Sequence, residues 1–329
     1  MPEETEETEK KEVTVQNESE ESDFLSPIEL KEDIFLQMEE NRKKFDDSFK
    51  KTKRINLLIV CGFMAVIVLI IIFLRGNGAF LPVLIVLVAL YFIVLSLYSK
   101  KTKEKLNAEA SSTIRDYFAI LDSYITQNEA FGEVKFNAER KLDETLFPSL
   151  KICKDIHHVG GRDVIRGTLF GDPFVAGDSL VKTNEKKEDG TMQEYIVFLG
   201  KLFVIEKKRP DLEGRIVIYL KGKGANGPTD IEDLTKCEGI LSDKFDVYAS
   251  ENSCDVLSAE MKETLESYER NDTLIDMFIT IDKERTSFGF SYSDGVMKVP
   301  LFEPIPKEEI LQFKSDVEKM VGFLSASGK

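Results

Sequence analysis

Two long apolar runs stand out in the pattern of hydrophobic and polar positions. Ile55 to Leu74 and Ala79 to Tyr98 each extend for 20 residues without a charged side chain. A helix rises about 1.5 Å per residue, so each run is long enough to cross the roughly 30 Å hydrocarbon core of a bilayer. Only Arg75 to Gly78 connect them, so the two helices must be antiparallel neighbours. The pattern predicts a transmembrane hairpin.

The basic residues beside these runs predict how the hairpin is oriented. Eight cations flank its outer ends, whereas its turn carries the single Arg75. The eight are Lys50, Lys51, Lys53, Arg54, Lys100, Lys101, Lys103 and Lys105. By the positive-inside rule we predict a multi-pass protein of the cell membrane with both termini in the cytoplasm. The same cations would also suit a lipid-specific site, but topology signals are the simpler interpretation.

The apolar positions on either side of the hairpin recur at helical spacing. Ile34, Met38, Phe45 and Phe49 fall on one face and predict a juxtamembrane helix within residues 28–54. After the second run, apolar positions step by four and three in a heptad-like seam that predicts a helical stalk within residues 99–147. Its members are Ala110, Ile114, Tyr117, Leu121, Tyr124, Asn128 and Phe131. We infer that the two segments pair as an antiparallel, coiled-coil-like stalk, the alternative being that a partner's helix occupies either seam.

From about Pro148 the pattern changes to strands, so residues 148–329 are expected to form one cytoplasmic domain. The expected strands are Tyr195 to Ile205, Arg215 to Leu220, and a hairpin of Phe288 to Tyr292 with Met297 to Leu301 around Asp294-Gly295. The expected helices run from about Ser258 to Glu269 and onward from Pro306. Because the strands come in hairpins, we predict the α+β class, with a mainly antiparallel sheet and accompanying helices.

Charge separates the first residues from the rest of the chain. The formal net charge is -15, and Met1 to Asp23 holds ten carboxylates against Lys10 and Lys11. With almost no apolar residue to bury, residues 1–27 should be an acidic disordered tail. No basic region precedes a short apolar core here, so we expect no cleavable signal peptide. The acidic pI of about 4.9 and the lack of a basic stripe argue against nucleic acid as a partner.

Metal-binding and redox motifs are not apparent. Cys61, Cys153, Cys237 and Cys254 show no CxxC spacing, so we expect Cys61 in the membrane and the other three as buried, reduced thiols in the cytosol. The two histidines, His157 and His158, are adjacent and would point in different directions, which disfavours shared metal ligation. We predict no metal.

One glycine motif suggests a dinucleotide site but lacks its context. Gly222 to Gly227 fits G-x-G-x-x-G and follows a predicted strand. In a true fingerprint the last glycine lies in a helix, whereas Pro228 follows here. The segment is therefore predicted to be a loop between strands. For the chain as a whole, we predict no catalytic, cofactor-binding or metal-binding residue.

Four segments of the second half of the chain together resemble a known family. They are Tyr195 to Val204, Leu212 to Ile218, Phe245 to Ala249, and the Asp294-Gly295 hairpin that ends in Leu301-Phe302-Glu303-Pro304. Over about Ile165 to Pro304, their order and spacing are similar to those of the bacterial membrane protein family catalogued as domain of unknown function 3137. That family commonly carries a transmembrane pair ahead of the domain. It has no established activity, so the resemblance implies no catalytic residue.

Three missing features favour a function in binding. The sequence has no histidine-centred nucleophile site, no ligand spacing for a catalytic metal and no phosphate-cradling loop. We therefore hypothesise a membrane-anchored cytoplasmic binding or scaffold module, non-catalytic and without a cofactor. The alternatives are a membrane-bound enzyme that uses carboxylates, or a lipid-handling domain. A protein partner or self-association through the juxtamembrane helices would make Phe45, Phe49, Tyr117 and Leu121 important.

Overall fold

The computed structural model describes residues 23–74, 80–150, 155–187, 190–220, 231–250, 253–292 and 298–327. The chain divides into two compact units. We call Phe35–Tyr117 with Pro300–Ile305 the hairpin unit. The remainder, which is Met1–Ile34, Phe118–Val299 and Pro306–Lys329, is the sheet unit.

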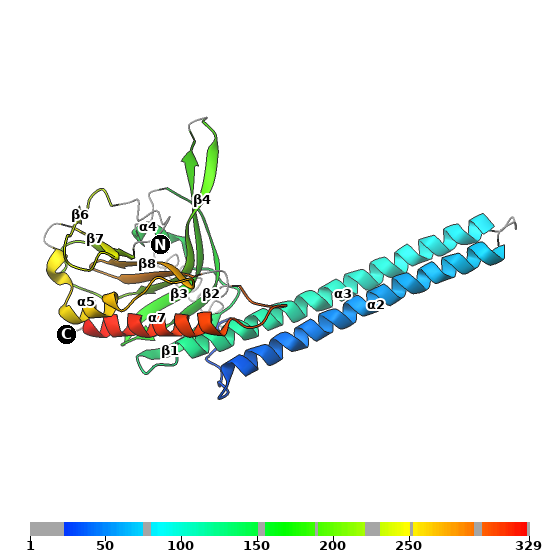
Figure 1. Ribbon diagram of the computed structural model, residues 1–329, viewed down its shortest axis with the longest axis horizontal. Helices are drawn as coiled ribbons and strands as arrows, with labels where there is room; N and C mark the ends of the chain where they lie inside the picture. The colour runs from blue at the N-terminus through cyan, green and yellow to red at the C-terminus, as the bar shows by residue number, and fades with distance from the viewer. Residues whose placement is uncertain are drawn as a thin grey trace, which may run out of the picture. The chain divides into compact units, whose positions relative to one another are not determined.

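Two long antiparallel helices form most of the hairpin unit: α2 (Ile34–Leu74) and α3 (Phe80–Ile125) (Figure 1). The rings of Phe63 and Tyr91 stack with their centroids 3.8 Å apart, and Ser48 Oγ donates a 2.6 Å hydrogen bond to Glu109. These contacts confirm the inferred pairing of the two helices. Each helix contains a segment long and apolar enough to cross a bilayer. The predicted turn at residues 75–78 lies outside the described residues.

A short segment after the sheet packs on α2 within the hairpin unit. The ring centroid of Phe302 lies 5.6 Å from that of Phe45 and 4.9 Å from that of Phe49. Residues 298–306 are irregular, so the prediction of a strand that includes Val299 and Leu301 is wrong. Pro300 and Pro304 lack the N–H that a strand pairing requires. Asp294-Gly295 lies outside the described residues.

A nine-stranded sheet organises the described part of the sheet unit, in the order β1-β2-β3-β4-β9-β8-β5-β7-β6. Every neighbouring pair is antiparallel, which confirms the α+β class. The strands are β1 (Phe131–Asn137), β2 (Ile156–Leu169), β3 (Asp172–Lys186), β4 (Met192–Ile205), β5 (Ile216–Leu220), β6 (Thr235–Lys236), β7 (Phe245–Ala249), β8 (Leu274–Ile281) and β9 (Thr286–Tyr292). The helical stalk expected over residues 99–147 ends at Ile125, because β1 begins at Phe131.

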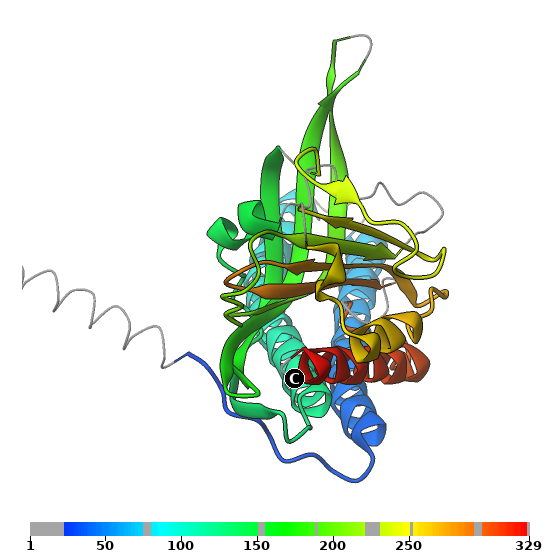
Figure 2. The same cartoon turned by 90° about the vertical axis from the view of Figure 1, so that its left-hand side faces the viewer.

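Two helices cover one face of the sheet (Figure 2). The predicted helices are confirmed as α5 (Ala259–Glu266) and α7 (Lys307–Ala326). Ser258 caps α5 by accepting a 3.2 Å hydrogen bond from the amide of Met261. Stacked aromatic rings of β9 pack against α7, with Phe288 5.4 Å from Phe323 between centroids. Burial of these rings holds the helical layer on the sheet.

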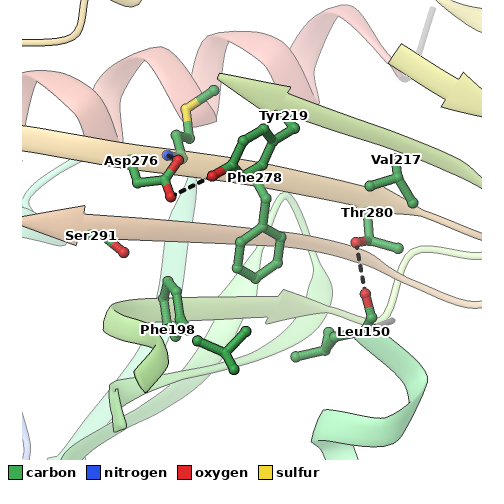
Figure 3. Close-up of a pocket in the computed structure, with 10 residues that line it drawn as sticks. Leu150, Phe198, Val217, Tyr219, Asp276, Phe278, Thr280 and Ser291 are labelled. Atoms are coloured by element: carbon green, nitrogen blue, oxygen red, sulfur yellow. Dashed lines mark hydrogen bonds between the residues drawn. The ribbon is translucent and has the colours of Figure 1, made fainter. Parts of the chain in front are cut away.

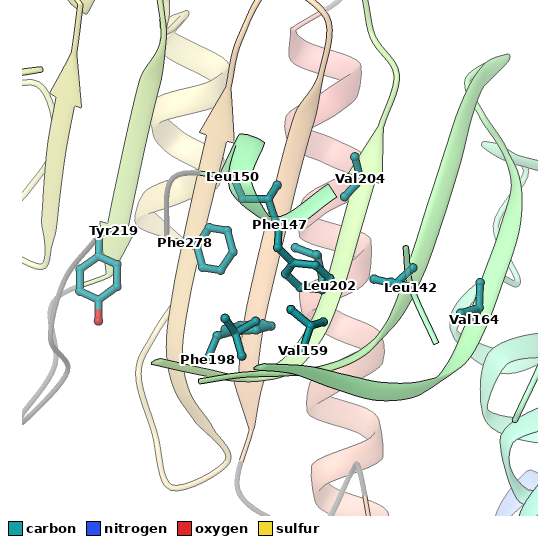
Figure 4. Close-up of a cluster of buried hydrophobic side chains, with 11 residues drawn as sticks. Leu142, Phe147, Leu150, Val159, Val164, Phe198, Leu202, Val204, Tyr219 and Phe278 are labelled. Atoms are coloured by element: carbon teal, nitrogen blue, oxygen red, sulfur yellow. The ribbon is translucent and has the colours of Figure 1, made fainter. Parts of the chain in front are cut away.

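The opposite face is covered by the segment between β1 and β2, which contains η1 (Glu144–Leu146) and α4 (Phe147–Leu150). Phe147 and Leu150 lie over side chains of β4 and β8, with α7 behind the sheet (Figure 4). Phe198 and Phe278 meet edge to face at 5.3 Å between ring centroids. The sheet therefore has an apolar core on both faces.

The edge strand at one end of the sheet is paired with another segment, and the edge strand at the other end is short. The amide and carbonyl of Leu25 pair with those of Phe136 on β1 at 2.8 and 2.9 Å, and β6 at the other end has two residues. Phe24 lies between the guanidinium groups of Arg140 and Arg166, at 5.5 and 4.8 Å from its ring centroid. Residues 23–27 were expected in the disordered tail, but in the structure they are ordered along β1.

The cysteines differ from the expectation in one respect. Cys61 is a free, exposed thiol on α2, within the predicted membrane run. Cys237 is disulfide-bonded, so the expectation of a reduced thiol is wrong for this residue. The spacing rules used on the sequence detect metal and redox motifs, and cannot detect a pair brought together by the fold.

Candidate functional site

The densest group of buried ionisable side chains surrounds Lys201 of β4. Its ammonium forms an ion pair with Asp163 of β2, and lies 3.3 Å from a carboxylate oxygen of Asp178 of β3 and 3.5 Å from one of Asp122 of α3. All four side chains are between 0% and 7% exposed. We call these four residues the Lys201 cluster.

Backbone irregularities bring two of the members into place. The pairing of β2 with β3 shifts register between Arg162 and Ile165, and Asp163 within that bulge has a φ of 60°. Aspartate tolerates this conformation better than most residues, and a bulge re-aims a side chain. Gly200 precedes Lys201 at a close crossing, where a Cβ would lie 2.0 Å from the carbonyl oxygen of Phe290. The small residue therefore lets β4 lie against β9.

Burial and charge set the protonation of the cluster. Burial raises the pKa of Asp122 well above its usual range, with Asp163 adding to this effect and Lys201 opposing it. Burial likewise raises the pKa of Asp178 to about 7, against the opposing charge of Lys201. Burial disfavours the charged form of Lys201, but three carboxylates outweigh it and hold its pKa above the usual value. A lysine held in its protonated form lacks the free electron pair that nucleophilic attack requires, so the cluster is suited to holding structure together.

The same region fixes the last turns of α3 in the sheet unit. Lys314 of α7 donates hydrogen bonds to the carbonyl oxygens of Ile125 and Gln127, at 3.5 and 3.2 Å. A cation at this position compensates the partial negative charge of a helix C-terminus. Ser123 accepts a 3.0 Å hydrogen bond from the amide of Ile28. Asp122, Ser123 and the end of α3 are therefore bound to three different parts of the sheet unit.

The seam residues expected to receive a partner are covered within the chain. Phe45 is 6% exposed and Tyr117 4% exposed in the hairpin unit, and Leu121 is 2% exposed in the sheet unit. Phe49 contacts Phe45 and Phe302. The helical spacing of these apolar residues is therefore explained by their packing within the chain.

A small cavity opens between β4, β5, β8 and β9 (Figure 3). Its volume is about 20 Å³, which suffices for one water molecule and not for an organic ligand. Tyr219 donates a 2.7 Å hydrogen bond to Asp276 at its margin. Burial raises the pKa of Asp276, and burial together with this hydrogen bond raises that of Tyr219. The pair is a satisfied polar contact in an apolar wall.

A much larger hollow lies beside the turn between β8 and β9. This cleft of about 950 Å³ is open to solvent and lined by side chains of both charges. The charged members are Glu213, Arg215, Asp233, Asp282, Lys283, Glu284 and Arg285. Asp282 Oδ1 accepts hydrogen bonds from the amides of Glu284 and Arg285 at 2.8 and 2.9 Å, which fixes the turn. We call this hollow the charged cleft.

Arg215 gives the charged cleft a hydrogen-bond donor that is not used within the described chain. Its amide donates a 3.0 Å hydrogen bond to Ser250 Oγ, and its guanidinium lies 4.0 Å from Asp282. Its Nε has no acceptor among the described residues. A carbonyl or carboxylate from a bound molecule would satisfy this donor.

The motifs weighed in the sequence do not form a reaction centre in the described residues. His157 and His158 are exposed on β2, and the glycine motif at residues 222–227 lies outside the described part. Across that part, no three His, Cys, Asp or Glu side chains are placed to hold a metal. The Lys201 cluster was missed, although Lys201 and Asp122 are each a lone charge within an apolar run, which is the signal that would have found them.

Comparison of the chain with protein-family models, curated proteins and solved structures gave no match.

Proposed function

We propose that the protein is a membrane-anchored binding or scaffold module without catalytic activity. The hairpin unit would hold it in the bilayer, and the charged cleft would receive a polar segment of a partner protein. The observation that carries the proposal is the contrast between two sites. The buried ionisable cluster is closed to solvent, whereas the large hollow is open and presents charges of both signs.

Exposed apolar side chains support the anchoring role. Along the predicted runs, Leu58 is 71% exposed, Ile72 64% and Leu97 68%. A water-soluble helix pair would bury such side chains, because each one left in water costs about 1.5–3 kcal/mol. A bilayer removes this cost, and spans of this length and composition suit it. The resemblance to the family with a transmembrane pair agrees with this proposal.

The character of the cleft supports binding of a protein segment. Enclosed sites for small ligands are mostly apolar with a few polar groups, whereas this cleft is wide and its rim carries Lys283, Glu284 and Glu213, all exposed. Opposite charges along an exposed groove favour a partner of complementary charge pattern and set its orientation.

Site-specific crosslinking in intact membranes tests the cleft. A photoreactive amino acid at Lys283 should give a crosslink to one identified protein, and Arg285→Glu should abolish it. The matched control places the same group at Glu139, which is exposed elsewhere on the sheet unit. Equal crosslinking from both positions, or none from Lys283, would contradict the proposed binding site.

Two features of the chain favour opposite orientations across the membrane. The flanking basic residues favour cytoplasmic termini, whereas a disulfide at Cys237 is typical of an oxidising compartment. We propose the cytoplasmic orientation. A cysteine at Lys329, in a variant without Cys61, should stay unlabelled by an impermeant thiol reagent in intact cells and react after the cells are opened. Labelling in intact cells would refute the orientation and agree with the disulfide.

A further inference from the structure

We propose that the hairpin unit binds the headgroups of anionic lipids through the eight basic residues at the ends of its apolar runs. This inference rests on the proposed membrane anchoring and adds the class of lipid that the protein selects. The eight are Lys50, Lys51, Lys53, Arg54, Lys100, Lys101, Lys103 and Lys105, and we call them the basic belt.

The two halves of the belt lie at the same level along the hairpin. Ser48 contacts Glu109, and Phe63 stacks on Tyr91, so these two contacts fix the register of α2 against α3. At about 1.5 Å per residue, the basic residues of both helices begin within about 3–6 Å of the Ser48 contact and end within about 9–14 Å of it. Four cations from one helix therefore lie beside four from the other.

Most of this charge is not neutralised within the hairpin. Lys50 pairs with Asp46 at 2.6 Å and Lys105 with Glu109 at 3.6 Å. The other six cations of the belt have no carboxylate partner in the described part of the chain. All eight side chains are exposed. The belt is thus a local concentration of positive charge in a chain whose net charge is -15.

Its position favours lipid headgroups over an acidic protein as the partner. Exposed apolar side chains begin directly at the belt, with Ile55 37% and Leu57 63% exposed on α2 and Leu97 68% exposed on α3. Where these apolar side chains enter the hydrocarbon core, the belt lies at the depth of the phosphates. Each lysine or arginine near an anionic leaflet strengthens attraction about fivefold, and the guanidinium of Arg54 matches two phosphate oxygens.

Fluorescence quenching in vesicles tests the inference, because the chain contains no tryptophan. Tyr98→Trp places a single reporter two residues before Lys100. The full chain is reconstituted into mixtures of phosphatidylcholine and phosphatidylglycerol, with one lipid brominated at a time. From the quenching we expect a binding constant for phosphatidylglycerol at least about fivefold higher than that for phosphatidylcholine. This preference should fall at high salt.

Variants distinguish binding by the basic belt from a general attraction of the protein to anionic lipid. Changing the unpaired Lys53, Arg54, Lys100 and Lys101 to Gln should bring the ratio of the two lipid binding constants close to one. The control, Lys50→Gln with Lys105→Gln, removes two paired cations and should keep most of the preference. Equal quenching by the two lipids in the unaltered belt would overturn the inference while leaving the anchor intact. A lack of quenching by either lipid would instead refute the membrane anchoring itself.

Discussion

Replacing Lys201 by methionine tests whether the Lys201 cluster holds the sheet unit together. The change keeps an unbranched side chain of similar reach but leaves Asp122, Asp163 and Asp178 without their cation. These carboxylates are between 0% and 7% exposed, so water cannot take over the role of the ammonium. Removing one partner from a buried ion pair costs about 3–5 kcal/mol. A typical domain is stable by about 5–15 kcal/mol, so the loss should be large.

The measurement is a urea titration of the full chain in a non-ionic detergent, in which the circular dichroism signal of the sheet reports unfolding. Lys182→Met is the matched control, because Lys182 pairs with Glu194 at 2.7 Å near the surface, where an ion pair contributes about 0–1 kcal/mol. Adding Asp163→Asn to Lys201→Met should recover part of the lost stability by removing one unpaired charge. If Lys201→Met shifts the midpoint no more than Lys182→Met does, the cluster does not stabilise the fold as argued.

Three further predictions concern pH, packing and thiol chemistry. Because the pKa of Asp178 is raised from 3.8 to about 7, its protonation favours the folded state at low pH, and this stability is lost as pH rises through 7. The free energy of unfolding should therefore fall between about pH 4 and 7, by at most about 1.4 kcal/mol per pH unit for this one proton, and Asp178→Asn should flatten that slope; an unchanged slope would contradict the raised pKa. Gly200→Ala should destabilise the sheet unit by about 1–3 kcal/mol or more, measured by the same titration, because its Cβ would meet the carbonyl of Phe290. An unchanged midpoint would show that β4 and β9 can separate at no cost. In mass spectra of the denatured, unreduced chain, Cys61 should be alkylated and Cys237 should not; alkylation of Cys237 without a reductant would refute its disulfide.

The elements predicted from the sequence were those with an uninterrupted period. The apolar positions of α7 step regularly, and the predicted inward residues Ile310, Phe313, Val317, Met320 and Leu324 are all 0–2% exposed. Strand β2 was missed because it contains two register shifts, one between Ile156 and His158 and one between Arg162 and Ile165. Each shift breaks the period of two on which strand prediction depends.

The sequence can mark Asp122 and Lys201 as lone charges in apolar runs, but it cannot show that they meet in one site. Asp122 and Lys201 are separated by 79 positions (201 minus 122) and belong to a helix and a strand. Asp163 joins them only because a bulge turns it inward. The charged cleft combines loops next to β5 and the turn after β8 in the same way. Periodicity reports which face of an element is buried, but not which elements share that burial.

The two ends of the sheet have a consequence for a protein held in a bilayer as proposed. Copies confined to a surface collide in two dimensions and with a common orientation, which favours pairing between exposed sheet edges. Leu25 occupies part of the outer side of β1, and β6 offers only two residues for pairing. In the described part of the chain, neither of these two ends provides a long template on which the strand of a neighbouring copy could extend the sheet. At these two ends, growth of the sheet from one molecule into the next is therefore disfavoured.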